Sequence, residues 1–199
     1  MAAIESKFLI GNNWGAANLV EQQPVSCATS SYGYASQGCN GGYSDDAIRF
    51  ASRNTLVVES AYPYSARSAR CVAQKSTVKG LKLSGPAIRV AANKEALKLA
   101  LLKAPVTVYF NVLSDFMMYR SGIYPGTSCP TGSTYVNHAM LLVGYNDTGL
   151  AGSSYWLVRN SWGATWGEAG YARVAMTDLG ACGLYTTVWA VPAISTANV

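Results

Sequence analysis

The sequence predicts an α+β protein of two domains, with a helical N-terminal half and an antiparallel, β-barrel-like C-terminal half. Apolar residues recur at helical spacing in the first part of the chain, whereas the part after Pro105 breaks into short β-branched or aromatic runs divided by Gly, Pro, Asn and Ser. The pattern changes near residues 85–92, so we expect domains at residues 1–90 and 91–199. The chain has 199 residues, half of them hydrophobic, which is enough material for a core.

Three helices are expected, each with apolar residues about one turn apart. Residues 2–9 form the first. Ser44 is a candidate cap for the second, whose first turn carries two aspartates that face the positive end of the helix dipole. Asn93 is a candidate cap for the third, and Pro105 ends it. The apolar faces are formed by Ile4 and Phe8, by Ala47, Phe50 and Ala51, and by Leu97 and Leu101.

Four strands are expected in the second half, where short β-branched or aromatic runs lie between turn residues. Their predicted ranges are residues 106–110, 138–145, 155–160 and 170–175.

Composition excludes several classes of function. No stretch approaches the roughly 18 uninterrupted apolar residues of a membrane helix, so we expect no membrane partner. The net charge is +5, but the fifteen Lys and Arg are scattered, which argues against a nucleic-acid partner. The chain has one histidine and no CxxC pair, whereas a structural zinc site needs four clustered nitrogen or sulfur ligands. We therefore expect no metal and no cofactor.

The five cysteines are widely spaced, as in disulfide-bonded proteins of oxidising compartments. An odd count indicates a free thiol, a partner in another chain or a missing partner. The five are Cys27, Cys39, Cys71, Cys129 and Cys182.

The strongest functional signal is the lone histidine, His138, at the head of an apolar strand, with Asn160 at the end of a later one. A histidine that acts as a general base needs an acceptor for its second ring nitrogen, and an asparagine carbonyl can serve. Trp162 can shield that hydrogen bond from water. A lone histidine is more often a satisfied core residue, and Asn160 could be an unrelated turn residue. The residues around the two favour the catalytic interpretation.

Those surrounding residues carry a family resemblance. NHAMLLVGY (residues 137–145) and WLVRNSWGATWGEAGY (156–171) resemble the histidine and asparagine motifs of the papain-like cysteine peptidases, which include the cathepsins. Residues 21–27, GCNGGY (38–43), AYPY (61–64) and ACGL (181–184) are similar to further family segments. The resemblance covers nearly the whole chain, in order. It implies the papain-like two-domain fold, with the active-site cleft between the domains, and cleavage of peptide or protein substrates.

The resemblance also implies residue roles. His138 would be the general acid/base, Asn160 its orienter, and Trp162 the shield and part of the leaving-side subsite. Cys27 would pair with Cys71 and Cys129 with Cys182, which leaves Cys39 over. Among the residues expected to bind substrate, Gly41 and Gly42 would pair with its extended backbone. The pocket for the second substrate residue would be lined by Tyr43, Tyr109, Val136 and Thr187. Asn137 and Trp162 complete the expected set.

One departure from the family pattern concerns the nucleophile. The family carries it in a CGSCW segment, at the start of a helix whose second half resembles residues 2–5. No cysteine precedes Cys27, which occupies a disulfide position. The nucleophile and the oxyanion-hole glutamine are therefore expected upstream of Met1, in a segment that would also hold the partner of Cys39. A complementing N-terminal segment or a partner chain would cover the apolar surface that the absent half-helix leaves.

Three functional interpretations follow. The first, favoured because His138, Asn160, Trp162 and Cys39 are retained, is an active thiol endopeptidase represented by an incomplete chain. The second is a papain-fold pseudoenzyme that serves as a binding or structural subunit. The third, a lectin-like secreted β domain, rests only on composition. In each case the chain as written is expected to be inactive alone, since a histidine without its thiol cannot form the thiolate–imidazolium pair. The resemblance and the cysteines indicate a secreted or lysosomal/vacuolar protein, and the sequon at residues 146–148 permits glycosylation.

Overall fold

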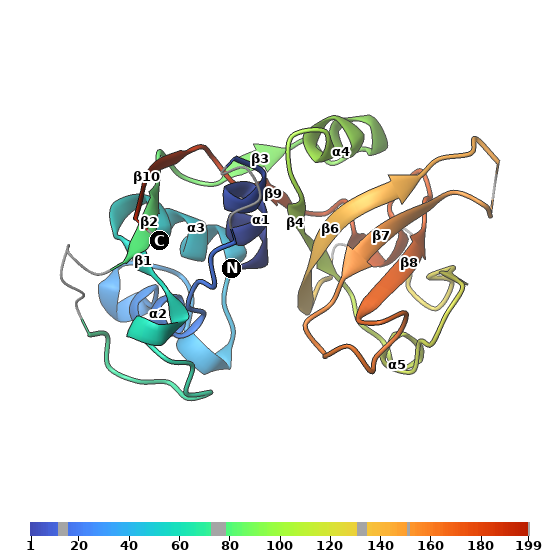
Figure 1. Ribbon diagram of the computed structural model, residues 1–199. Coiled ribbons are helices and arrows are strands. Elements are labelled where there is room, and N and C mark those ends of the chain that lie inside the picture. Colours follow the sequence, from blue (N-terminus) through green and yellow to red (C-terminus); the bar gives the residue numbers. More distant parts are fainter. Residues whose placement is uncertain (12–15, 73–78, 131–134, 151, 199) are drawn as a thin grey trace. The chain divides into compact units, whose positions relative to one another are not determined.

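A computed structural model describes residues 1–11, 16–72, 79–130, 135–150 and 152–198, and the chain forms two compact units (Figure 1). Unit 1 comprises Met1–Ile88 and Val191–Val199, and unit 2 comprises Arg89–Ala190. The change of unit at residue 88 falls within the range 85–92 where the sequence pattern changes. Helices and sheets coexist in an α+β fold, and the described strands form two separate sheets.

The described residues of unit 1 form three α-helices and a small sheet. The helices are α1 (Ala2–Gly11), α2 (Gln22–Cys27) and α3 (Ser44–Arg53), with 3₁₀ turns at Ser30–Tyr32, Gly38–Asn40 and Glu59–Ala61. The sheet has the order β1 (Leu56–Val57), β2 (Gly80–Leu83), β10 (Ile194–Asn198), with antiparallel pairings. Ile4 and Phe8 are buried, as the helical spacing predicts.

The return of the chain to unit 1 differs from the predicted division at 91–199. Strand β10 pairs with β2, with Ile194 opposite Leu83, and so residues from Val191 onward belong to unit 1. The choice of partner strand depends on a free strand edge more than a hundred residues away, which local sequence patterns do not encode.

The helix starts show one wrong prediction and one confirmed one. Ser44 is the first residue of α3 rather than its cap, and the cap position is held by Tyr43, whose side chain makes no capping hydrogen bond. Asn93 caps α4 (Lys94–Leu101), because its side-chain oxygen accepts a hydrogen bond of 2.9 Å from Ala96 N.

Unit 2 is built on a seven-stranded sheet. Its strand order is β3 (Ile88–Val90), β9 (Val188–Ala190), β4 (Val106–Phe110), β6 (His138–Asn146), β7 (Tyr155–Arg159), β8 (Tyr171–Ala175), β5 (Ile123–Tyr124). The four predicted strands are confirmed to within one residue at each end. The pairing of β5 with β8 is parallel, so the sheet is not purely antiparallel. A short helix α5 (Ser114–Met117) and a 3₁₀ turn (Ala181–Gly183) complete the unit.

The core of unit 2 is rich in aromatic side chains. Trp156, Phe110 and Phe116 are fully buried on and beside the central strands. The indole N–H of Trp156 donates to the Tyr185 hydroxyl at 3.1 Å, and burial raises the pKa of Tyr185 to about 12. This packing fixes the strands whose ends carry the predicted catalytic residues.

Both predicted disulfides are present. Cys27–Cys71 lies within unit 1 and Cys129–Cys182 within unit 2, at sequence separations of 44 and 53 residues. Cys39 is a free, exposed thiol. None of the helices in the described ranges is both long enough and apolar enough to cross a membrane.

Candidate active site

The neighbouring antiparallel strands β6 and β7 bring His138 and Asn160 to the same end of the strand pair in the unit 2 sheet. His138 is the first residue of β6, and Asn160 directly follows the last residue of β7. Because Leu141 lies opposite Arg159 in this pair, the start of β6 faces the end of β7. The pairing of these two strands therefore brings together two residues that are 22 positions apart in the sequence.

The hydrogen bond between the two side chains has a defined direction. His138 Nε2 lies 2.9 Å from Asn160 Oδ1, and the same oxygen lies 2.8 Å from the backbone N of Ser161. A backbone N–H can only donate, so the asparagine atom at this point must be its carbonyl oxygen. That oxygen is an acceptor, so Nε2 must carry the proton that it receives. In the neutral ring, Nδ1 is then the atom with the free lone pair and the one that can accept a proton.

Burial and aromatic packing hold Asn160 in place. The residue is only 8% exposed, and its backbone N donates to Gly170 O at 2.9 Å. The Trp162 ring lies 5.0 Å from the His138 ring, centre to centre, with 31° between the planes. Trp162 is 37% exposed, so one part of its ring covers the site while another part faces solvent. A hydrogen bond screened from water in this way is stronger than an exposed one.

Sequence reasoning missed the aromatic support beneath Trp162. Trp166 meets Trp162 edge-on at 5.1 Å, and Phe116 meets it at 6.3 Å. The Trp166 indole N–H donates to Met117 O at 3.1 Å, which fixes that ring. The repeated Trp-Gly pairs at 162–163 and 166–167 are the only signal of this cluster in the sequence.

The side chain of Asn137, which is predicted to contact substrate, forms hydrogen bonds with the protein's own backbone. Its Oδ1 accepts from Val112 N at 2.8 Å, and its Nδ2 donates to Val112 O at 3.0 Å. Its backbone N donates to Phe110 O at 3.1 Å. These three bonds tie the residue before His138 to the end of β4. The geometry therefore gives Asn137 a positioning role.

Three predicted pocket residues also lie in unit 2, all half-buried. Tyr109 pairs with Ala139 across β4 and β6, next to His138, and its backbone N donates to Thr187 O at 3.3 Å. Val136 precedes His138 by two residues. The structure thus brings Tyr109 and Thr187 together.

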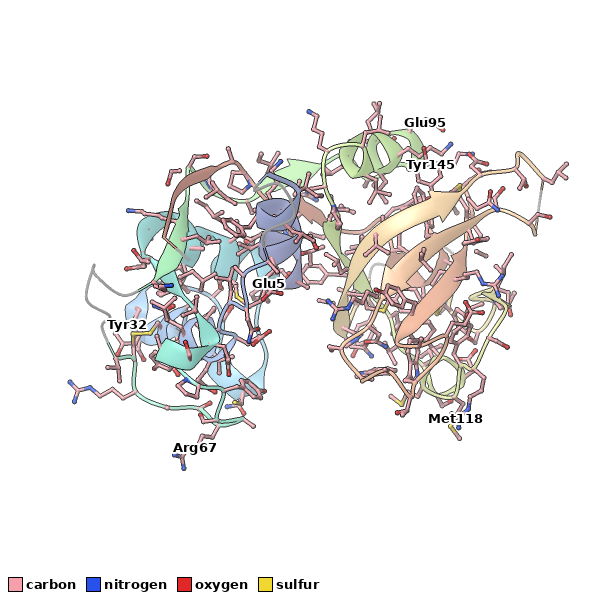
Figure 2. All side chains as sticks on the ribbon, viewed as in Figure 1. Glu5, Tyr32, Arg67, Glu95, Met118 and Tyr145 are labelled. Atoms are coloured by element: carbon pink, nitrogen blue, oxygen red, sulfur yellow. A yellow bond between two sulfur atoms is a disulfide. The ribbon has the colours of Figure 1, made fainter. Side chains whose placement is uncertain are left out.

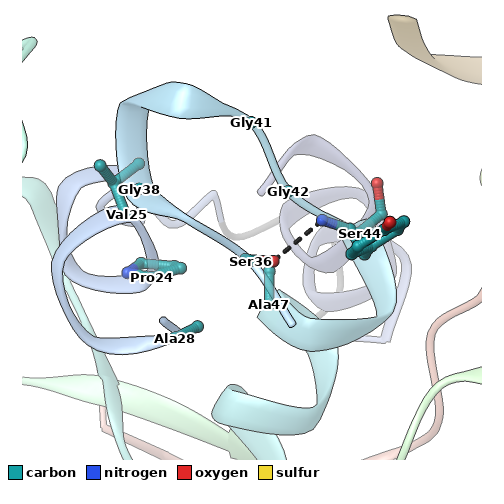
Figure 3. A pocket seen from close by; sticks show the side chains of 10 residues that line it. Pro24, Val25, Ala28, Ser36, Gly38, Gly41, Gly42, Ser44 and Ala47 are labelled. Atoms are coloured by element: carbon teal, nitrogen blue, oxygen red, sulfur yellow. Dashed lines mark hydrogen bonds between the residues drawn. The ribbon is translucent and has the colours of Figure 1, made fainter. Parts of the chain in front are cut away.

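The other predicted substrate residues, Gly41, Gly42 and Tyr43, form an exposed loop in unit 1. The loop borders an open groove of about 220 Å³ (Figure 3). Gly41 has φ +114°, a conformation that favours glycine. A Cβ on Gly42 would come within 2.6 Å of Ser36 Oγ. Glycine at both positions is thus explained by backbone conformation and close approach.

A buried carboxylate anchors this glycine loop. Asp46 Oδ2 accepts from Ala35 N at 2.9 Å, and from Ser36 N and Ser36 Oγ at 2.8 Å each. Ser36 Oγ in turn accepts from Tyr43 N at 2.9 Å, the dashed line in Figure 3. The sequence placed Asp46 only at the helix dipole, whereas the structure shows that it is 2% exposed and holds the loop.

The two glycines differ in what their backbones offer. The Gly41 carbonyl accepts from Gln37 N at 2.8 Å. The N–H and C=O of Gly42, in contrast, bond to none of the described residues. These are the groups that pair with an extended chain in a β ladder.

Thiols are unevenly distributed between the units. In the described part of unit 2 both cysteines form the disulfide, and Cys39 in unit 1 is the free one. No group of three or more metal-ligating side chains occurs in the described ranges. The described part of unit 2 therefore holds no free thiol.

The comparisons with known proteins agree with this fold. The family model "Papain family cysteine protease" matches residues 1–191. A cathepsin L-like proteinase of Fasciola hepatica is 38% identical over 164 residues, which are 82% of this chain and 48% of that protein. Pro-cathepsin H of Medicago truncatula is 37% identical, over 92% of this chain and 51% of its own length. The chain spans about half the length of the curated relatives it matches.

Solved structures give the same result. Bromelain from Ananas comosus, in complex with the E64 inhibitor, matches with a TM-score of 0.81 and 32% identity over 96% of this chain and 85% of that chain. A digestive procathepsin L2 of Tenebrio molitor matches with a TM-score of 0.84 and 31% identity over 96% and 58%. The papain-family cysteine proteases are hydrolases of peptide bonds, and their family model matches nearly the whole chain. This chain belongs to the papain family of cysteine proteases.

Proposed function

We propose that this chain carries the general acid/base part of a papain-type endopeptidase site that cleaves peptides or proteins. The observation that supports it most is the directed hydrogen bond from His138 Nε2 to Asn160, which leaves Nδ1 as the base. Such a base removes the proton of a cysteine thiol, and the thiolate then attacks the carbonyl carbon of the scissile peptide. The imidazolium returns the proton to the leaving amine, and a water molecule activated by the same nitrogen releases the acyl group.

The nucleophile in this proposal is a cysteine outside residues 1–199. Four of the five cysteines here are in disulfides, and the family resemblance makes Cys39 the partner of another cysteine in the upstream segment. The oxyanion-hole glutamine would come from the same upstream segment. An extended substrate would pair with Gly42, and Tyr109, Val136 and Thr187 would line the pocket for its second residue.

The second candidate is a catalytically dead subunit of the same fold. The observation that supports it is that four of the five cysteines are in disulfides, which leaves Cys39 as the one free thiol. The open backbone groups of Gly42 would still allow it to bind a peptide.

The orientation of the base can be tested without the nucleophile, because the chain has a single histidine. In ¹⁵N NMR of the neutral ring, we expect His138 to be protonated at Nε2. Asn160→Ala removes the acceptor and is expected to restore a mixture of tautomers. Protonation at Nδ1 in the wild-type chain would contradict the proposed mechanism.

Activity separates the two candidates. The chain alone should neither hydrolyse a fluorogenic peptide nor react with a thiol-directed epoxide. An N-terminal extension that carries the family's nucleophile segment should produce both activities. His138→Ala in the extended chain should abolish hydrolysis. An extended chain that is folded and disulfide-complete, yet inactive, would favour the subunit.

The compartment is part of the proposal. Two disulfides form only where the redox environment permits them, as in secreted proteins. We infer a secreted or lysosomal/vacuolar protein.

A further inference from the structure

Asn146, the last residue of β6, begins the only Asn-x-Ser/Thr sequence of the chain, Asn146-Asp147-Thr148. The residue in the middle is not proline, so the sequence meets the requirement for N-linked glycosylation. A sequence match alone has no structural content. The question is whether the folded chain leaves the acceptor nitrogen free and leaves space for a sugar.

Strand pairing places the Asn146 side chain away from the core. Asn146 lies opposite Tyr155, whereas its neighbour Tyr145 lies opposite the fully buried Trp156. Successive side chains in a strand point to opposite faces, so Asn146 and Trp156 occupy different faces of the sheet. Asn146 is exposed, and its carboxamide makes no hydrogen bond to any residue in the described ranges.

The other two residues of the sequon have structural tasks. Asp147 forms an ion pair with Lys98 of α4 and accepts from Gly149 N at 3.1 Å. Thr148 N donates to Ser154 Oγ at 3.0 Å, and Thr148 Oγ1 accepts from Leu150 N at 3.2 Å. Asp147 and Thr148 therefore stabilise the folded chain through these contacts, whereas the carboxamide of Asn146 makes no such contact with the described residues.

A glycan at this position is compatible with catalysis. His138 and Asn146 are the two ends of β6, nine residues long, so their Cα atoms lie about 25 Å apart at the usual rise of a strand. Tyr145 marks this far end of β6 in Figure 2, beside Glu95 of α4. A sugar there would not cover the base.

We propose that Asn146 is an N-glycosylation site. The donor is an oligosaccharide linked to a lipid pyrophosphate in the secretory compartment. Asn146 Nδ2 forms a bond to the anomeric carbon of the first N-acetylglucosamine and loses one proton. The bond from that carbon to the pyrophosphate oxygen breaks, and the lipid pyrophosphate leaves with the electron pair. The inference rests on the secretory route proposed above and not on the peptidase activity.

The test is expression of the whole 199-residue chain behind a cleavable secretion signal in a eukaryotic host. We expect the mobility shift of one glycan on a denaturing gel. Treatment with a peptide-N-glycosidase should remove that shift and convert Asn146 to aspartate, which mass spectrometry detects. Asn146→Gln and Thr148→Ala should each lose the shift. Thr148→Ser should keep it, because the hydroxyl remains.

A matched control tests whether the chain has been exposed to the enzyme that transfers the oligosaccharide. Ala66 is exposed and has φ +53°, a left-handed conformation that asparagine tolerates well. Ala66→Asn creates a second sequon with Ser68, and we expect this variant to carry one glycan more than the wild type. If Ala66→Asn is modified only at residue 66 and the wild type is unmodified, the proposal is overturned.

Discussion

The histidine–asparagine site of unit 2 and the glycine loop of unit 1 are held in place by different means. At the first site, strand pairing and a cluster of aromatic rings fix two side chains, so that one nitrogen of His138 is a base. At the second, one buried carboxylate, Asp46, fixes a stretch of backbone whose glycines carry no side chain. Proton transfer requires an oriented side chain, whereas recognition of an extended peptide requires an accessible, rigid backbone. The two units thus fix different kinds of group, a side-chain nitrogen in unit 2 and backbone amides in unit 1.

Removal of a disulfide should have the largest effect on the free energy of unfolding. The size of this effect should be similar for the disulfide of unit 1 and the disulfide of unit 2. The loops closed by Cys27–Cys71 and Cys129–Cys182 span 44 and 53 residues, for which chain entropy predicts about 4 kcal/mol each. We expect each paired Cys→Ser variant to lower the free energy of unfolding by about that amount. Denaturant unfolding measures it. Cys39→Ser is the control and should change stability by less than about 0.5 kcal/mol.

Asp46→Ala should selectively weaken the glycine loop. The change leaves the N–H groups of Ala35 and Ser36 without their buried acceptor, at a cost of about 3 kcal/mol. Hydrogen exchange should increase across residues 35–43, while the hydrogen bond of His138 is retained. Asp45→Ala is the matched control, since Asp45 lies in the same first turn of α3 but is half-exposed. Equal effects of the two substitutions would show that Asp46 acts only through the helix dipole.

Asn137→Ala should have a smaller effect, and in unit 2. It removes two hydrogen bonds to Val112, so we expect a loss of about 1–2 kcal/mol, with faster exchange at the end of β4. Asn137→Asp keeps the acceptor for Val112 N and loses the donor, so its effect should be intermediate. If Asn137→Ala leaves stability unchanged and impairs only peptide binding, the residue is a substrate contact after all.

The smallest expected effect concerns pH. The hydrogen bond from Lys98 lowers the pKa of Asp147 from 3.8 to about 2. A carboxylate whose pKa is lower in the folded state adds stability above its unfolded pKa, and this is lost as the pH falls. The wild-type chain should therefore be more stable than Asp147→Asn at neutral pH, and the difference should close between pH 3.8 and about 2. Thermal unfolding across that range measures it. A constant difference would contradict the assigned pKa.

The sequence by itself determined part of the local elements and the family. Helical spacing of apolar residues identified three helices, because side chains on one face must share one environment, and β-branched or aromatic runs between turn residues identified four strands. Asn93 was recognised as a cap because its side chain bonds only three residues along the chain. The motifs around His138 and Asn160 identified the family, and with it both disulfides.

Only the tertiary structure decided how distant groups satisfy one another. Asp46 is an anchor because the fold brings Ala35 and Ser36 to it, and a local reading could place it only at a helix dipole. The amide of Asn160 has one orientation because Ser161 N–H donates to it, which in turn decides which nitrogen of His138 is the base. Strand β10 joins unit 1 because β2 offers a free edge there. Each of these outcomes depends on contacts across the chain, and periodicity reports only the environment of each residue.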